Sequence, residues 1–145
     1  MSTILLPISL ATAGAAAIVN VWISVRVGGA RRSSKVSIGD GGNPALIARM
    51  RAHANFVEYT PFVLILIALI EYNIGSPLWL SVVSILYLVG RVAHVLGMDG
   101  LARAREIGIT ITLLTLVGLG LYAAALPFLN GPRATPHLEV APFKG

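Results

Sequence analysis

Four long apolar stretches most constrain what this chain can fold into. They cover about residues 3–25, 45–73, 78–97 and 105–129, and each is long enough to cross a bilayer core of roughly 30 Å as a helix. Charged residues are only 12% of the 145 residues, about half the share typical of soluble domains. The sequence therefore predicts a single all-α integral membrane domain, a four-transmembrane-helix antiparallel bundle, with a tail at residues 130–145.

Composition excludes several classes of protein. The chain has no cysteine, so disulfides, thiolate–metal sites and a cysteine nucleophile are ruled out. The net charge is +5, but the cations gather at the ends of apolar stretches rather than on a soluble basic face, so no nucleic-acid partner is expected. His53, His94 and His137 share no metal-ligand spacing, and no metal site is predicted. The first stretch is too long for the core of a signal peptide and is expected to stay in the mature protein.

Glycine, proline and basic residues separate the apolar stretches. Residues 26–44 read as a basic, glycine-punctuated loop, in which Asn43 is a candidate N-cap and Pro44 suits the first position of the second helix. Pro61 falls inside that helix and removes one backbone hydrogen bond. Asn20, near the end of the first stretch, bonds either to a neighbouring backbone group or to a partner helix; the sequence leaves both open.

The distribution of lysine and arginine predicts the orientation. Of eleven such residues, all but Arg133 and Lys144 fall at one predicted membrane face. The nine at that face are Arg26, Arg31, Arg32, Lys35, Arg49, Arg51, Arg91, Arg103 and Arg105. The positive-inside rule then predicts cytosolic basic loops and both termini on the non-cytosolic side.

A polar stripe lies at the start of the second apolar stretch, where it predicts contact with a ligand or with another helix. Arg51, Asn55 and Glu58 recur at i, i+4 and i+7, so they share one helix face that Phe62 continues. Ionisable groups in a bilayer cost about 2.5–3.5 kcal/mol each and usually face a bundle interior or a cavity. Arginine matches carboxylates, and the stripe as a whole suits a ligand with carboxylates, an amine and peptide groups. A purely structural network between helices is an equally open interpretation.

The predicted topology brings further polar residues to the same end. Tyr59 follows the stripe on the second helix, and the others come from the third and fourth helices and the first loop: Arg91, His94, Arg103, Arg105, Arg31 and Arg32. The surplus of cations favours an anionic ligand entering from the cytosol. The loop cations also fit contacts with lipid headgroups. His53 lies on the opposite side of its helix from Asn55, where a packing or hydrogen-bonding role is expected.

Several motifs resemble the MAPEG superfamily, the membrane-associated proteins of eicosanoid and glutathione metabolism. They are R-x-R-A-H-x-N-x-x-E-Y-x-P at 49–61, A-R-R at 30–32, G-R-x-x-H-x-x-G at 90–97 and R-x-x-G-x-x-x-T at 105–112. The loop at 39–44, Gly-Asp-Gly-Gly-Asn-Pro, is most similar to the bacterial branch, whose microsomal glutathione transferase-like members imply an inner-membrane location.

The resemblance implies a homotrimer that binds glutathione between adjacent subunits. It assigns glutathione binding to Arg51, Asn55, Glu58, Tyr59 and His94, together with Arg31 or Arg32 from the adjoining subunit, and it assigns thiolate stabilisation to Arg105. Eicosanoid-forming relatives carry tyrosines where this chain has His94 and Met98, so an eicosanoid substrate is not expected.

Two functional hypotheses follow. The first is a glutathione transferase, with possible peroxidase activity, that uses glutathione as cosubstrate, needs no metal, and takes apolar electrophiles from the surrounding membrane lipids. The second is a non-catalytic membrane protein of the same family, whose polar site binds a thiol or a lipid headgroup or stabilises the trimer.

Overall fold

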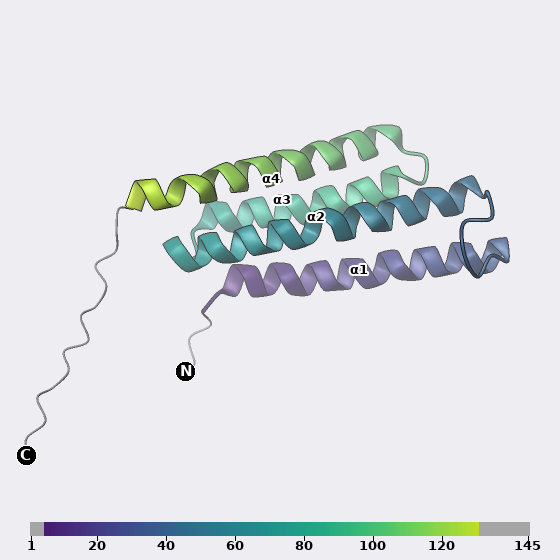
Figure 1. The fold of residues 1–145 in the computed structure, drawn as a ribbon, viewed down its shortest axis with the longest axis horizontal. Coiled ribbons are helices and arrows are strands. Elements are labelled where there is room, and N and C mark those ends of the chain that lie inside the picture. The colour runs from purple at the N-terminus through teal and green to yellow at the C-terminus, as the bar shows by residue number, and fades with distance from the viewer. Residues whose placement is uncertain (1–4, 131–145) are drawn as a thin grey trace, which may run out of the picture.

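The computed structural model describes residues 5–130, and four helices make up nearly all of them (Figure 1). They are α1, Pro7–Ser34; α2, Pro44–Ile74; α3, Leu78–Gly97; and α4, Ala102–Asn130. All four are long and apolar enough to cross a membrane. The prediction of an all-α membrane protein with four spans is confirmed.

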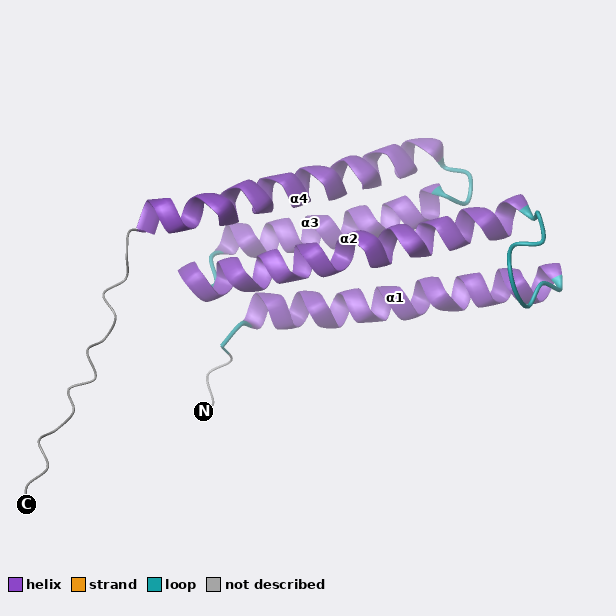
Figure 2. Ribbon diagram, in the orientation of Figure 1, coloured by secondary structure: helices purple, strands orange, loops and turns teal. Residues whose placement is uncertain are grey.

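The helices lie side by side, and their connections divide the bundle into two ends (Figures 1 and 2). Residues 35–43, between α1 and α2, and residues 98–101, between α3 and α4, lie at one end, here called the loop end. Residues 75–77 lie at the other end with the start of α1 and the end of α4, and this is called the termini end. The tail at residues 131–145 falls outside the described residues.

The first helix differs from its predicted span. Residues 26–34, expected in a loop, are helical, so α1 runs to Ser34. The glycines at 28 and 29 do not interrupt it, and Arg31 and Arg32 occupy its last turn, where cations interact favourably with the helix dipole. Lys35 then ends the helix in a left-handed conformation (φ 54°), with its N–H directed to carbonyls of the last turn.

The start of α2 agrees with its sequence signals. The side-chain oxygen of Asn43 accepts hydrogen bonds from the backbone N–H groups of Ala45 (3.0 Å) and Leu46 (3.1 Å), while Pro44 occupies the first turn. The N-cap prediction is confirmed. Pro61 lies inside α2 without ending it.

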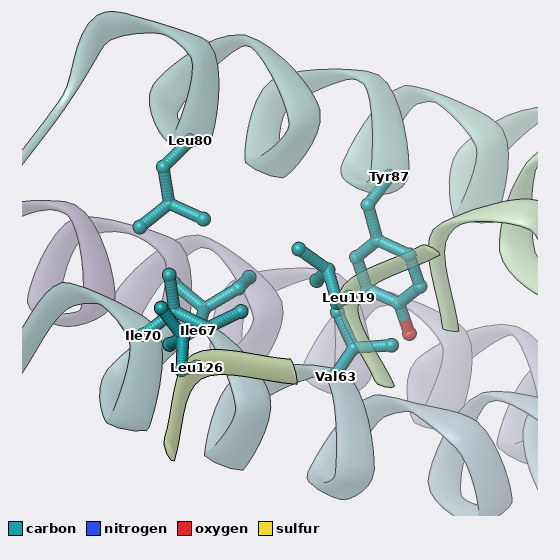
Figure 3. Packing of buried hydrophobic residues seen from close by; sticks show 7 residues of the cluster. All are labelled: Val63, Ile67, Ile70, Leu80, Tyr87, Leu119 and Leu126. Carbon is teal, nitrogen blue, oxygen red and sulfur yellow. The ribbon is translucent and has the colours of Figure 1, made fainter. Parts of the chain in front are cut away.

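Two apolar clusters form the core. One lies toward the termini end, and Figure 3 shows its members converging from α2, α3 and α4: Val63, Ile67, Ile70, Leu80, Tyr87, Leu119 and Leu126. The other lies toward the loop end and joins α1, α2 and α3 through Ala16, Ile23, Ala52, Phe56 and Val95. Both halves of the bundle therefore bury apolar side chains. The two halves differ instead in their polar groups.

Glycines set the close approach of α3 and α4. A Cβ atom at Gly97 would overlap the backbone of Arg105, and one at Gly108 would lie 2.5 Å from the carbonyl oxygen of Gly90. Small residues let helix backbones approach closely in membranes. Here they place the first turn of α4 directly against the last turn of α3.

Candidate functional site

The predicted stripe on α2 lies on the outer face of the bundle near the loop end. Arg51 and Glu58 are exposed, and Asn55 and Tyr59 are half-buried beside them. Neither Arg51 nor Glu58 forms an ion pair or side-chain hydrogen bond with any other residue in the described range 5–130. Two opposite charges on a membrane-spanning helix are thus left without a partner among the described residues.

Asn55 adds an unpaired acceptor to the same face. Its Oδ1 atom is buried but has no hydrogen-bond partner among the described residues. A buried amide oxygen without a donor costs about 1–3 kcal/mol. A donor from outside the protomer, such as an N–H group of a ligand or of another subunit, would remove that cost.

Arg105 lines a cavity of about 250 Å³ at the loop end. The other lining residues come from α2, the end of α3 and the turn before α4: Ala48, Gly97, Met98, Gly100 and Ala102. Arg105 is the only charged residue among them, and Arg103 is not part of the lining. Of the two candidate arginines on α4, the geometry favours Arg105.

Arg51 lines a different cavity, of about 200 Å³, together with Asp40, Ile47, Met50 and Ala54. Within one protomer the structure therefore does not join Arg51 and Arg105 in one enclosed site. It places them in two openings of the loop end, with α2 contributing to both.

The two candidate arginines of the first loop differ in their surroundings. Arg31 donates from Nη1 to the carbonyl oxygens of Gly39 (2.8 Å) and Ser37 (3.3 Å), and its Nη2 lies 3.5 Å from Sδ of Met50. Arg32 is exposed, and its side chain has no hydrogen bond or ion pair within the described part of the chain. Arg31 holds the loop together, whereas Arg32 is available to a ligand.

Buried polar groups of α3 lie behind the stripe. Arg91 is 0% exposed, donates from Nη1 to Oγ1 of Thr112 (3.1 Å), and lies over the ring of Phe56 at 5.6 Å. His94 is 5% exposed, and its electrostatic neighbours are Arg91 and Arg105. On α3, His94 lies three residues after Arg91 and three before Gly97, which lines the cavity of Arg105.

The loop end also contains an ionic cluster that the sequence did not predict. The carboxylate of Asp99, in the turn between α3 and α4, pairs with Arg26 of α1 and with Nε of Arg49 of α2 (3.1 Å). Arg26 also lies over the ring of Trp22 at 4.9 Å. The feature of the sequence that could have predicted this cluster is charge, because Asp99 is an acidic residue in a turn at the strongly basic face.

A second polar contact explains His53. Its Nε2 atom lies 3.0 Å from Oδ1 of Asn20 and 3.3 Å from Oγ of Ser24, both on α1. The prediction of a hydrogen-bonding role for His53 is confirmed. Of the two alternatives for Asn20, the structure shows contact with a partner helix.

Acidic and histidine side chains do not gather into a metal-binding arrangement in the described range: no three or more His, Cys, Asp or Glu residues lie together there. The charged groups at the loop end are mostly guanidinium groups, which suit anions rather than metal ions. The arrangement is therefore chemically suited to binding a polar organic anion.

Four membrane-spanning helices with a cationic, partly unpaired polar end define this chain as an integral membrane protein with a candidate anion site. The MAPEG family model matches residues 9–125, and the chain belongs to the MAPEG family. It is also similar to the inner membrane protein YecN of Escherichia coli K12, at 36% identity over 84 residues, and equally to YecN of E. coli O6:H1. Each match covers 57% of this chain and 63% of the relative. The spans and these relatives support a multi-pass protein of the inner membrane.

Proposed function

We propose that this protein is a glutathione transferase, with peroxidase activity toward lipid hydroperoxides as a related reaction. It acts as a homotrimer of antiparallel four-helix bundles, with its loop end at the cytosolic face and both termini on the other side. Membership of the MAPEG family supports a glutathione-related function.

The observation that carries the proposal is the pair of unpartnered charges on the outer face of α2. Arg51 and Glu58 lie on a membrane-spanning helix with no ion-pair or hydrogen-bond partner among the described residues, and Asn55, between them in the sequence, has a buried Oδ1 atom without a donor. Glutathione carries two carboxylates, one ammonium group and two amides at neutral pH. Its carboxylates would pair with Arg51, its ammonium group with Glu58, and an amide N–H with Asn55, while Tyr59 and His94 line the site.

Arg105 is assigned to the thiol. A thiol with a pKa near 8.5 is mostly protonated at neutral pH, and a guanidinium group within a few Å favours the thiolate. Arg105 meets this need because it is the charged member of the cavity between α2, α3 and α4. Arg32, from the adjoining subunit, is assigned to the same ligand, because its side chain has no hydrogen bond or ion pair among the described residues.

The reaction follows from the thiolate. Its sulfur attacks an electrophilic carbon of an apolar substrate that enters from the lipid, an S–C bond forms, and the leaving group departs with its electron pair. With a hydroperoxide, two glutathione molecules are oxidised to the disulfide while the hydroperoxide is reduced to an alcohol and water. Both reactions need the same thiolate.

Glutathione titration of the purified protein in lipid nanodiscs tests the proposal. We expect saturable binding by calorimetry and the ultraviolet absorbance of a thiolate at neutral pH. Arg105→Ala should remove the thiolate absorbance, while the matched variant Arg103→Ala, two residues away on the same exposed helix end, should keep it. No binding and no thiolate in the unmodified protein would overturn the proposal.

The non-catalytic alternative rests on the same outward charges. Arg51 and Glu58 are equally placed to pair with a neighbouring subunit, and His94 and Met98 stand where relatives that form eicosanoids carry tyrosines. In that case Arg51→Ala and Glu58→Ala would dissociate the oligomer, as size-exclusion chromatography with light scattering would show. Loss of glutathione affinity in an intact oligomer would exclude a purely structural role for these two charges, and glutathione binding without thiolate formation or turnover would support a non-catalytic binding protein.

A further inference from the structure

Arg91 is the most deeply buried charge in the described chain that the proposed function leaves unused. Its guanidinium group makes one hydrogen bond, from Nη1 to Thr112 on α4. Its Nε and Nη2 atoms are buried and have no partner. None of the carboxylates in residues 5–130 pairs with it. The charge is therefore buried without a counter-ion.

A buried guanidinium group without a counter-ion lowers the stability of the fold unless a nearby anion interacts with it. Removing a guanidinium group from water costs several kcal/mol, and a carboxylate partner or a full set of acceptors normally offsets this cost. The face of Phe56 at 5.6 Å and the hydroxyl of Thr112 offset only part of it. An apolar side chain of similar length would fill the same volume at lower cost.

The groups around Arg91 indicate which anion its charge would favour. The titratable and charged groups around it are Tyr59 from α2, Tyr87 and His94 from α3, and, beyond His94, Arg105 from α4. Tyr59, His94 and Arg105 are three of the residues assigned to the glutathione site. Arg91 donates to Thr112, which lies seven residues, about two helical turns, after Arg105 on α4, so its enclosed guanidinium group lies deeper in the bundle than the cavity that Arg105 lines.

Burial strengthens the effect of this charge on its surroundings. The interaction between two charges varies inversely with the effective dielectric constant, which falls from about 80 in water to about 20 or lower inside a protein. Arg105 is exposed and is screened by water and salt, whereas Arg91 is not. A buried cation can therefore favour an anion in an adjoining cavity without touching it.

We infer that Arg91 is a second cation of the thiol site, a positioning residue that favours ionisation of the bound thiol from deeper in the bundle than Arg105. This inference rests on the proposed glutathione function. In the ionisation, the S–H bond breaks, its electron pair stays on sulfur and the proton passes to solvent. Arg105 would hold the thiolate at the mouth of the site, and Arg91 would supply the unscreened part of the positive potential.

The test is the pH midpoint of thiolate formation in glutathione bound to the full-length protein in nanodiscs. Arg91→Gln removes the charge and keeps a donor for Thr112, and Arg91→Met removes both. For either variant we expect the midpoint to rise by about one pH unit, which is about tenfold less thiolate at neutral pH. Arg91→Lys should stay close to the unmodified protein. Thr112→Val, which removes the hydrogen bond but not the charge, should also leave the midpoint unchanged.

Two further measurements separate this role from a structural one. Affinity for S-methylglutathione, whose sulfur cannot ionise, should be unaffected in the neutral variants. The carboxylates, ammonium group and amides of the ligand are assigned to Arg51, Glu58 and Asn55, not to Arg91. A neutral variant with an unchanged midpoint, or with only a lower unfolding temperature, overturns the inference while leaving the proposed function intact. Failure of the unmodified protein to bind glutathione overturns both.

Discussion

The two ends of this bundle treat their polar groups in opposite ways. At the termini end, Glu71 is 2% exposed, and both carboxylate oxygens are fully used. They accept from the backbone N–H groups of Ile8 (2.9 Å) and Ser9 (2.8 Å) and from the hydroxyls of Ser9 and Ser76 (2.6 Å each). The carboxylate thereby caps the N-terminus of α1, where the helix dipole also favours a negative charge.

In the half toward the loop end, several polar groups are left unpaired within the described residues, although others are paired, such as His53 with Asn20. Arg51 and Glu58 are unpartnered on the outside, Asn55 Oδ1 and His94 Nδ1 are unpartnered within, and Arg91 has a single hydrogen bond. A carboxylate that only holds helices together can be satisfied by its own chain. Polar groups that serve a ligand or a second subunit remain unsatisfied until it binds. The difference between the ends therefore gives a basis for testing which polar groups hold the fold and which bind a ligand or a second subunit.

The largest expected effect is at the satisfied end. Glu71→Ala leaves two backbone N–H groups at the start of α1 without acceptors, so we expect a loss of about 3 kcal/mol in the free energy of unfolding. Reversible unfolding in mixed micelles measures it. Glu106→Ala, an exposed carboxylate on α4, is the matched control and should change stability by less than about 0.5 kcal/mol. Equal behaviour of the two variants would show that the carboxylate does not cap α1.

A second prediction concerns the packing that shapes the cavity of Arg105. Gly97→Ala forces α3 away from the first turn of α4, and we expect a loss of about 1–3 kcal/mol together with a weaker effect of Arg105 on any bound thiol. Gly118→Ala is the matched control, because nothing lies within 4 Å of its added Cβ. The thermal unfolding midpoints of both variants are compared in one detergent. Equal midpoints would mean that α3 and α4 can move apart at Gly97 without loss of stability.

Asp99 tests the comparison at the loop end, because its carboxylate is paired within the described part of the chain. Asp99→Asn removes two partly exposed ion pairs and should cost about 1 kcal/mol, with the loss shrinking at high salt. In a double-mutant cycle with Arg49→Gln, the coupling energy should be positive at low salt and fall as salt is added. Zero coupling at low salt would place Asp99 among the unsatisfied groups of this half.

Much of the architecture could be predicted from the sequence, because membrane spans depend on length and hydrophobicity alone. The four spans, the Asn43 cap and the hydrogen-bonding role of His53 all agree with the structure. The length of α1 could not be predicted. Two adjacent glycines and a run of cations resemble a loop, while the favourable interaction of the cations with the helix C-terminus is a property of the folded helix.

The polar groups show where sequence reasoning ends. Periodicity places Arg51, Asn55 and Glu58 on one face, but it cannot say whether that face points into the bundle or out of it. Arg91 and Glu58 looked alike in sequence, as charges within apolar stretches, yet one is enclosed and the other exposed. The contacts of Glu71 with α1 and of Asp99 with α1 and α2 join residues 50 to 73 positions apart, and only the packed helices reveal them.

The smallest expected effect on protomer stability is at the outer stripe, and it discriminates best between the two kinds of polarity. Arg51→Gln and Glu58→Gln remove charges that form no hydrogen bond or ion pair with the rest of the described chain, so unfolding of the monomeric protein in detergent should change by less than about 0.5 kcal/mol. The same variants should weaken glutathione binding at least tenfold, because each would lose a charge-assisted hydrogen bond to the ligand. His53→Gln, on the opposite face of α2, should show the reverse, a small loss of stability with unchanged binding. A stripe variant that destabilises the isolated protomer while leaving ligand affinity intact would mean that its charge belongs, like that of Glu71, to the scaffold.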